Sequence, residues 1–368
     1  MSRQTVRFSV LGVFAGPAPS TGFQFNTGFN DIYTGANSGT NLIQGLQRVQ
    51  TVTDGFTVER TNVNQLGQLA YISQEIVNQP RVPVSLNWIT ADVSNERKLG
   101  LYVSGDKGAL KDILSQTQAD RNMFIAVAPE GVDEVGYTGQ SQVFQLNNCY
   151  FGSYSAEASV GGFATASATM QGLNYSTSTG SINQSLNVVN PTLGTIVPGV
   201  NYTLPLLTTG TVGSVSAIRY GDITCTVSGQ QGLSATDLKI QSYRLGFDTN
   251  LQDLLQLGSR FAYAKIPQFP INLNCSITAN YGDLVTGSLS NLLCLDSPFN
   301  LIISLYQPGC GASGPLAAQY TLNGVKLQGQ DFGAQDVGSN TATVTFNYNG
   351  QIGGPNDARV NLFITGQN

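Results

Sequence analysis

The feature that most constrains the fold of this chain is an internal repeat as long as a whole domain. Residues 80–87 read PRVPVSLN and residues 267–274 read PQFPINLN, an offset of 187 (267 − 80). Three further matches keep the same order with drifting offsets: Leu66-Gly67 with Leu257-Gly258 (257 − 66 = 191), Leu146-Asn147 with Leu322-Asn323 (322 − 146 = 176), and residues 165–169 with 341–345 (341 − 165 = 176). Because several matches in one order rarely arise by chance, the sequence predicts two tandem copies of one domain.

The composition fits β-structure with a neutral, polar surface. The chain has 368 residues, which is enough for two domains of ordinary size. Hydrophobic residues make up 41% and charged residues only 11%, where about 25% charged is typical of globular proteins. A surface with so few charges has little protection against association, and this predicts a protein that binds other subunits. The net charge of −5 argues against nucleic-acid binding, which needs a basic patch, but not against a surface past which DNA slides.

The cysteines and the apolar segments indicate a protein made in a cytoplasm, without a membrane span. The cysteines are Cys149, Cys225, Cys275, Cys294 and Cys310, and none forms a C-x-x-C pair. We expect reduced, mostly buried thiols rather than disulfides or a metal site. No apolar run approaches the roughly 20 residues of a transmembrane helix. The N-terminus loosely resembles a signal peptide, but its alternation of apolar and polar residues favours a β-strand.

Composition and the repeat together divide the chain into four segments. Residues 1–42 are an arm rich in Gly, Thr, Asn and Ser, residues 43–180 carry the first copy, and residues 214–368 carry the second. Between the copies, residues 181–213 continue a polar stretch that begins at residue 174. Because a structureless loop of this length is uncommon inside a compact domain, we expect either a solvated linker or an arm that packs on a neighbouring subunit, and favour the arm.

Both copies are predicted to be mainly β, each a β-sandwich or barrel with one short helix. Alternation of apolar and polar residues predicts half-buried strands, and short continuous apolar runs predict buried ones. In the first copy we expect strands over 47–52, 55–60, 81–90, 123–128, 142–151 and 163–173, and a helix over 107–118. In the second copy we expect strands over 270–278, 300–306, 320–327 and 341–348, and a helix over 288–295.

The residues that most enzymes and metal sites need are missing or scattered. The chain has no histidine, which removes the commonest general base and the commonest metal ligand. We interpret Glu130, Asp133 and Glu134 as a solvated acidic loop rather than a calcium site. The glycines of 309–314 are interpreted as a turn, because no Lys-Ser/Thr follows them to form a phosphate loop. The sequence therefore predicts no catalytic, cofactor-binding or metal site, and Trp88 is expected to be a core residue rather than a ligand platform.

Each copy carries the same features in the same order. An arginine (Arg60 or Arg244) precedes the Leu-Gly pair, and an aromatic stretch follows it (Tyr71, or residues 261–263). Then come the proline-led strand, the helix, the buried strand and two closing strands. This order resembles the tail tube proteins of long-tailed bacteriophages, and most of all the duplicated kind in which one chain carries two tube domains. The resemblance covers most of both copies and rests on order rather than on an invariant motif.

The resemblance implies a structural protein of the virion tail whose rings stack into a tube. Each ring would have a six-domain circumference, so a two-domain chain would form it as a homotrimer, with each domain closing part of a β-barrel around the lumen. The tube would conduct double-stranded DNA during ejection, through a lumen lined by polar, small or acidic side chains. Its partners would be further copies of itself and the terminator, tape-measure and distal tail proteins. We assign residues 1–42 and 174–213 to contacts between rings.

Three other interpretations remain open from the residues alone. A decoration or baseplate component of a virion would share the composition and the repeat, but would form shells or single rings. A bacterial surface adhesin or fibre subunit predicts a functional signal peptide and a binding face with exposed aromatic side chains. An enzyme is the least favoured class, because the chain lacks histidine and any constellation of carboxylates.

Overall fold

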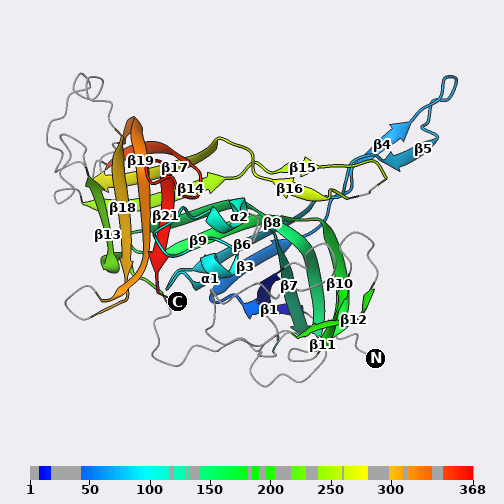
Figure 1. Ribbon diagram of the computed structural model, residues 1–368, viewed down its shortest axis with the longest axis horizontal. Coiled ribbons are helices and arrows are strands. Elements are labelled where there is room, and N and C mark those ends of the chain that lie inside the picture. Colours follow the sequence, from blue (N-terminus) through cyan, green and yellow to red (C-terminus); the bar gives the residue numbers. More distant parts are fainter. Residues whose placement is uncertain are drawn as a thin grey trace.

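The computed structural model shows a mainly β protein built around one large antiparallel sheet (Figure 1). The structure describes residues 8–17, 43–115, 120–129, 131, 141–180, 185–189, 196–203, 217–228, 239–258, 261–280, 298–309, 314–333 and 343–367. Within these residues the large sheet has 15 strands, and three two-stranded sheets stand apart from it. The predicted mainly β fold is confirmed. The large sheet is not closed, so a single chain does not form the expected barrel.

In the first half of the chain, strands surround one long strand, β8. They are β1 (Phe8–Pro17), β2 (Gln44–Gly45), β3 (Val49–Asp54), β6 (Val82–Ile89), β7 (Asp120–Pro129), β8 (Ser141–Ser159), β9 (Thr165–Gly172) and β10 (Asn174–Gly180). They pair in the order β1-β7-β8-β9-β6-β3, with β10 also on β8 and β2 on β1. The first part of β8 pairs with β7 and β10, and its last part pairs with β9, so β8 belongs to two layers.

In the second half of the chain, strands surround a second long strand, β19. They are β13 (Ile223–Ser228), β14 (Ile240–Asp248), β17 (Ile271–Asn280), β18 (Phe299–Tyr306), β19 (Leu316–Gly333), β20 (Thr343–Ile352) and β21 (Asn361–Gly366). They pair in the order β13-β18-β19-β20-β17-β14, with β21 also on β19. This is the strand order of the first half, with β19 in the place of β8 and β21 in the place of β10. A short 3-10 helix, η1 (Tyr220–Asp222), precedes β13.

Three hairpins leave the large sheet. β4 (Arg60–Val63) and β5 (Ser73–Ile76) lie between β3 and β6, and β15 (Gln252–Leu254) and β16 (Ala264–Ile266) lie between β14 and β17. Both of these connections contain a Leu-Gly pair whose glycine has positive φ, 86° at Gly67 and 85° at Gly258, which favours glycine. The third hairpin, β11 (Ser185–Val189) with β12 (Ile196–Thr203), lies in the polar stretch after β10. That stretch therefore contains paired strands.

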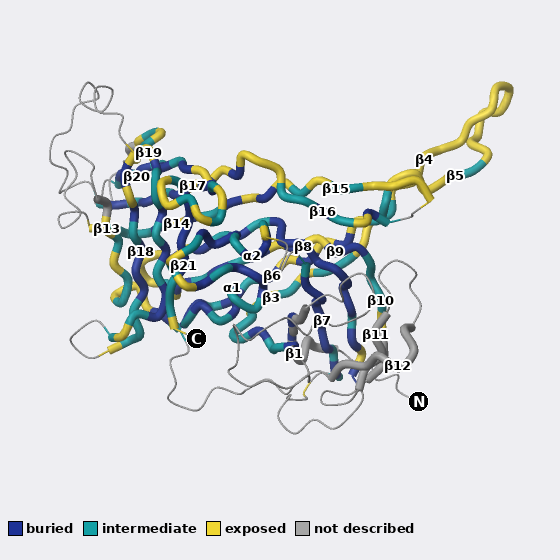
Figure 2. The backbone as a smooth tube through the Cα atoms, viewed as in Figure 1, coloured by how far each residue is buried: buried dark blue, intermediate teal, exposed yellow. Residues whose placement is uncertain are grey.

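One hydrophobic core runs through both halves of the chain. Its largest buried side chains include Trp88 and Tyr154 from the first half and Tyr320 and Phe346 from the second. Figure 2 shows this buried path along the strands of the two halves, with a long exposed stretch at the β4–β5 hairpin. Trp88 is 1% exposed, which confirms its predicted place in the core. Burial of such aromatic side chains is the main stabilising term for a domain of this kind.

Most of the predicted strands are present, and one is wrong. Residues 81–90, 123–128, 270–278 and 300–306 fall within or around β6, β7, β17 and β18. β8 and β19 extend well beyond their predicted spans, and β20 ends four residues later than predicted (352 − 348). Residues 55–60 do not form the expected strand. There the backbones of Thr57 and Arg81 exchange hydrogen bonds of 2.8 and 2.9 Å, after which the chain leaves the sheet to form the β4–β5 hairpin.

The helices of the first half differ from the prediction. Of the expected helix over 107–118, residues 116–118 lie outside the described residues, and the rest contains only α2 (Lys111–Leu114). An unexpected helix, α1 (Ser94–Lys98), precedes it, so the described part of this half has two short helices rather than one. Tertiary contacts explain the shortening, because the backbone N–H groups of Gly108 and Ala109 donate to the carbonyls of Pro355 and Leu362 in the second half. The helix expected over 288–295 lies outside the described residues.

Candidate assembly interface

The principal candidate site is the pair of open edges on the large sheet. Eight strands run side by side in the order β3-β6-β9-β8-β14-β17-β20-β19. Within the described residues, β3 pairs only with β6, and residues 326–333 of β19 pair only with β20. Each end of this run therefore presents backbone N–H and C=O groups that no described strand covers. Such edges are templates for pairing with another chain.

An internal junction between the halves shows how these strands pair. The last part of β8, residues 153–159, lies antiparallel to residues 242–248 of β14. Tyr154 lies opposite Phe247, and Ser153 lies opposite Asp248. The Val160 N–H donates to the Gln241 carbonyl oxygen (2.8 Å) just beyond this register. Val160 and Gln241 are therefore a hydrogen-bonded pair, and hydrogen-bonded and non-hydrogen-bonded pairs alternate along the two strands. Tyr154 and Phe247, six residues further along, form a hydrogen-bonded pair, and Ser153 and Asp248 form a non-hydrogen-bonded pair.

The direction of the free backbone groups on β3 follows from its pairing with β6. The Ile89 N–H donates to the Arg48 carbonyl oxygen (3.1 Å). Since backbone groups alternate along a strand, Asn87 also points toward β3, where it lies opposite Thr51. The N–H and C=O groups of Val52 therefore point outward, away from β6.

A surface ion pair crosses the internal junction. The Nε atom of Arg244 lies 3.7 Å from the Oε2 atom of Glu157, and these side chains are 70% and 50% exposed. Exposed pairs of this kind contribute about 1 kcal/mol or less to stability. We expect Arg244→Ala to change the free energy of unfolding by less than about 1 kcal/mol in urea titrations. A loss of several kcal/mol would show that the junction depends on this charge pair rather than on backbone pairing and core packing.

One face of the eight-strand run carries mostly small, uncharged polar side chains. Hydroxyl groups meet across neighbouring strands, with Oγ of Ser153 2.6 Å from Oγ1 of Thr169, Oγ of Ser155 2.8 Å from Oγ of Ser167, and Oγ1 of Thr278 3.0 Å from Oγ1 of Thr345. The opposite face carries the buried aromatic and aliphatic residues. Strict alternation along β6, β17 and β20 separates the two faces.

A buried polar centre joins the two halves beneath this sheet. The Tyr154 hydroxyl from β8 donates to Oε1 of Glu96 in α1 (3.0 Å), and it lies 2.9 Å from the Tyr320 hydroxyl of β19. All three side chains are almost fully buried. Burial raises the pKa of the Glu96 carboxyl from its ordinary value of 4.5 to about 7, and the nearby Asp92 charge adds to the rise, whereas hydrogen bonds from Tyr154 and Trp88 oppose it. The folded state is therefore more stable when the Glu96 carboxyl in this buried polar centre is protonated.

The two long hairpins differ in how they contact the rest of the chain. From β4 to the residue after β5, seven apolar side chains are exposed: Val63, Leu66, Leu69, Tyr71, Ile72, Ile76 and Val77. Figures 1 and 2 show this hairpin projecting from the body with an almost wholly exposed backbone. The β15–β16 hairpin instead lies along the first half. Ala262 is fully buried against Tyr150 and Leu173, and its N–H donates to Oε1 of Gln79 (2.8 Å).

Comparison with known proteins gives this chain no family. No protein-family model matches it, and no curated protein matches it.

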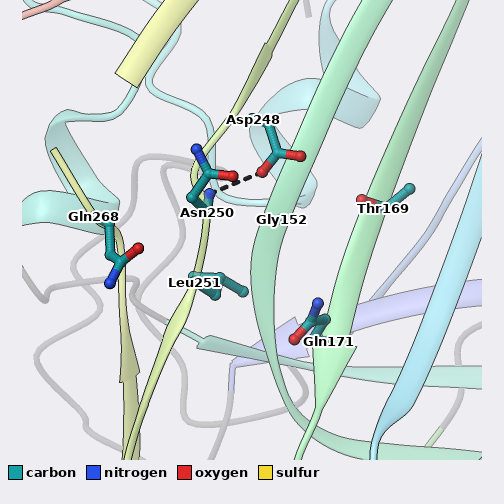
Figure 3. Close-up of a pocket in the computed structure, with 7 residues that line it drawn as sticks. All are labelled: Gly152, Thr169, Gln171, Asp248, Asn250, Leu251 and Gln268. Atoms are coloured by element: carbon teal, nitrogen blue, oxygen red, sulfur yellow. Dashed lines mark hydrogen bonds between the residues drawn. The ribbon is translucent and has the colours of Figure 1, made fainter. Parts of the chain in front are cut away.

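A polar pocket lies beside the internal junction (Figure 3). Its volume is about 360 Å³, and it is lined by Gly152, Thr169, Gln171, Asp248, Asn250, Leu251 and Gln268. The Asn250 N–H donates to Oδ1 of Asp248 (2.8 Å), which holds the turn after β14. One carboxylate and no cationic group line the pocket, so it offers hydrogen-bonding groups without an acid–base pair.

Chemical groups of other kinds are sparse in the part of the chain that the structure describes. No group of three or more Cys, Asp or Glu side chains is placed to hold a metal ion there, and none of its helices has the length and apolar character needed to cross a membrane. Cys149, Cys225 and Cys275 are free, and two of them are buried. Glu130, Asp133 and Glu134, most of the 309–314 turn, Cys294 and Cys310 lie outside the described residues.

The sequence located parts of this interface and missed others. The Leu-Gly pairs and the proline-led strands mark the hairpins and the strands that follow them. The open edges gave no sequence signal of their own, because an edge strand and a central strand have the same alternation when one face is buried. Glu96 was also missed, because it stands in the polar run SNERK of residues 94–98, where nothing in the sequence signals burial.

Proposed function

We propose that this chain is a structural protein with two duplicated domains that assembles with copies of itself through its open sheet edges. The carrying observation is that β8 and β14 already form, inside one chain, the junction that β19 and β3 would form between two chains. Each half contributes four neighbouring strands to the run. The long strand (β8 or β19) lies at one end of the four, and the strand before the hairpin (β3 or β14) lies at the other end. Repeating the same contact between copies covers both edges, as stable sheet proteins require.

Three details support the duplication. The long strands carry a β-bulge at the same place, between Phe151 and Ser153 in β8 and between Leu327 and Gly329 in β19, an offset of 176 (329 − 153). The matched asparagines have matched partners: Asn147 lies opposite Asn174, and Asn323 lies opposite Asn361. The hairpins share one register, since the Ile72 N–H donates to Val63 and the Tyr263 N–H donates to Leu254. Bulges are usually retained within families of related domains.

The duplication predicts the register between two chains. Phe247 lies opposite Leu273, and Val52 lies opposite Leu86, the repeat partner of Leu273 (273 − 86 = 187). By these sequence offsets Val52 is the counterpart of Phe247, and Gln330 is the counterpart of Tyr154 (330 − 154 = 176). The rows of paired residues differ by four between the halves, because the row through Gln330 reaches Tyr243 rather than Phe247 (247 − 243 = 4). In the new junction Val52 pairs with Gln330 of another copy by backbone hydrogen bonds. The N–H and C=O groups of Val52 point away from β6 within the single chain and are therefore free to make these bonds.

Closure of these junctions into a ring, and stacking of rings, gives the tube that the sequence resemblance implies. We propose a ring of three chains in the tail of a bacteriophage virion, with the polar face of the eight-strand run toward a lumen for double-stranded DNA. Among the described strand residues, the charged side chains on that face are Glu157, Asp248 and Asp331 against Arg244 and Lys326, so these strands form no basic surface that would hold the phosphates. The terminator, tape-measure and distal tail proteins remain the proposed partners. Segments 1–42 and 174–213 remain the proposed contacts between rings, apart from β1 and β10, which pair with β7 and β8 inside the large sheet.

Electron microscopy combined with one disulfide tests the proposal. In the double variant Thr53→Cys with Gly329→Cys, the two cysteines occupy the counterparts of Asp248 and Ser153. Paired residues at such non-hydrogen-bonded positions have Cα atoms about 4.5 Å apart, within the range of a disulfide. A Cβ added at Gly329 meets nothing within 4 Å. We expect covalent trimers on mild oxidation, and hollow filaments with three-fold end views by negative stain.

The control is a one-residue slip of the register. In Thr53→Cys with Gln330→Cys the side chains fall on opposite faces of the sheet, so little cross-linking is expected. The unmodified chain sets the background from its own cysteines. Monomers at high concentration, or equal cross-linking in both variants, would contradict the edge-to-edge assembly. Closed shells without a bore would instead favour a decoration protein.

A further inference from the structure

The exposed β4–β5 hairpin lacks a partner that the β15–β16 hairpin has. The two hairpins follow corresponding strands, share a Leu-Gly pair at positive φ and share one register. Yet β16 alternates between half-buried and buried residues, while all four residues of β4 are exposed. Leu66 and Leu69 at the tip are 99% and 110% exposed. An isolated two-stranded hairpin is marginally stable in water, so this one requires a surface to lie on.

The second hairpin shows what that surface is. It leaves the second half and lies on the first half, across the junction that β14 forms with β8 (Figure 1). Its contacts there are Ala262 against Tyr150 and Leu173, and the Tyr150 hydroxyl lies against the backbone of Lys265. Lys265 is only 4% exposed and forms an ion pair with Asp253 across the hairpin. The hairpin thus bridges two domains that are joined edge to edge.

We propose that the β4–β5 hairpin lies on the second half of a neighbouring copy in the same way. This inference rests on the proposed edge-to-edge assembly, because only the β3–β19 junction brings a second half beside the first hairpin. The register equates Tyr71 with Ala262, since Ile72 and Tyr263 make the same backbone bond. The partner of the β4–β5 hairpin is therefore a second copy of this chain, and Tyr71 is the hairpin residue that becomes buried against that copy.

The receiving surface follows from the same correspondence. Lys326 is the counterpart of Tyr150 (326 − 150 = 176), and Val360, which precedes Asn361, is the counterpart of Leu173, which precedes Asn174. Val360 is half-buried and Lys326 is exposed. A tyrosine ring can pack on an aliphatic lysine stem and on a valine, where the hairpin of the second half offers only the methyl group of an alanine. The two contacts are complementary in size. On the hairpin the large Tyr71 stands in place of Ala262, and on the receiving surface the flexible Lys326 stands in place of the bulky Tyr150.

Photo-crosslinking tests this contact in the assembled, full-length protein. Benzoylphenylalanine replaces Tyr71, the filaments are irradiated, and the linked peptides are identified by mass spectrometry. We expect links to the segments around Lys326 and Val360 of a second copy. The same probe at Tyr220, which is similarly exposed, serves as the control and should not link to those segments.

A substitution gives an independent readout. Tyr71→Ala removes a side chain that is 52% exposed in the single chain, so circular dichroism should be unchanged. Burial of an aromatic anchor at an interface predicts about a tenfold rise in the concentration needed for assembly, against less than twofold for Tyr220→Ala. Normal filaments with links elsewhere, or no effect of Tyr71→Ala, would overturn the hairpin contact and leave the edge-to-edge proposal standing. A chain that stays monomeric overturns both.

Discussion

A Val52→Pro substitution is expected to stop the chain from assembling while the monomer remains folded. In the single chain β3 is an edge strand, where proline is tolerated because the missing N–H is not part of the existing ladder. In the proposed junction the same N–H bonds to Gln330 of the next copy. Leaving its partner unsatisfied costs about 1–3 kcal/mol, or roughly tenfold or more in affinity at each junction. Because a ring of three chains contains three such junctions, the affinity for ring closure falls about a thousandfold in total.

The measurement is the concentration at which filaments form, followed by sedimentation and electron microscopy. Val52→Thr is the matched control, because it keeps the branched shape at Cβ and the backbone N–H. It should assemble within a few-fold of the unmodified chain. If Val52→Pro also assembles normally, the outer edge of β3 is not an interface.

The second large effect concerns the stability of the single chain and its dependence on pH. We expect Glu96→Gln to raise the free energy of unfolding by about 3 kcal/mol at pH 8 and to change it little at pH 4. The folded chain holds the Glu96 proton up to a pKa of about 7, while the unfolded chain loses it near 4.5. The unmodified protein therefore loses stability as pH rises through this window of 2.5 units, at about 1.4 kcal/mol per unit.

Urea titrations at several pH values measure this difference at concentrations where the protein is monomeric. Glutamine keeps the shape of the protonated acid and can accept the hydrogen bond from Tyr154. Glu75→Gln, at an exposed position on β5, should leave the stability unchanged at every pH. A Glu96→Gln variant that is destabilised at pH 8, or equally altered at both ends of the range, would mean that Glu96 is not a neutral acid in the fold.

Local patterns in the sequence were enough for the strands that have one buried face. β6 and β17 alternate so regularly that their bounds lie within two residues of the predicted spans. The same patterns could not give the length of β8 or β19, because each passes from one layer to another and the face it buries changes at the bulge. Nor could they give the helices, since the backbone of Gly108 and Ala109 is held by the second half of the chain.

The candidate interface depends on relations that no local pattern carries. Which strand is left at an edge follows from the order of pairing, and that order is a property of the whole fold. The matched Leu-Gly pairs did indicate the two hairpins, yet their surroundings differ because the β15–β16 hairpin finds a neighbour within the chain and the β4–β5 hairpin does not. Glu96 became recognisable only when α1 placed it against tyrosines from both halves.

The covalent link between the halves has a consequence for the accuracy of assembly. Since β8 and β14 are joined within one polypeptide, every second junction of a ring exists before any two chains meet. A closed ring therefore contains an even number of halves, whatever the number of chains. Separate domains could close a ring with one domain too many or too few whenever the curvature of the growing ring fluctuates. Domains that are joined in pairs cannot make this error.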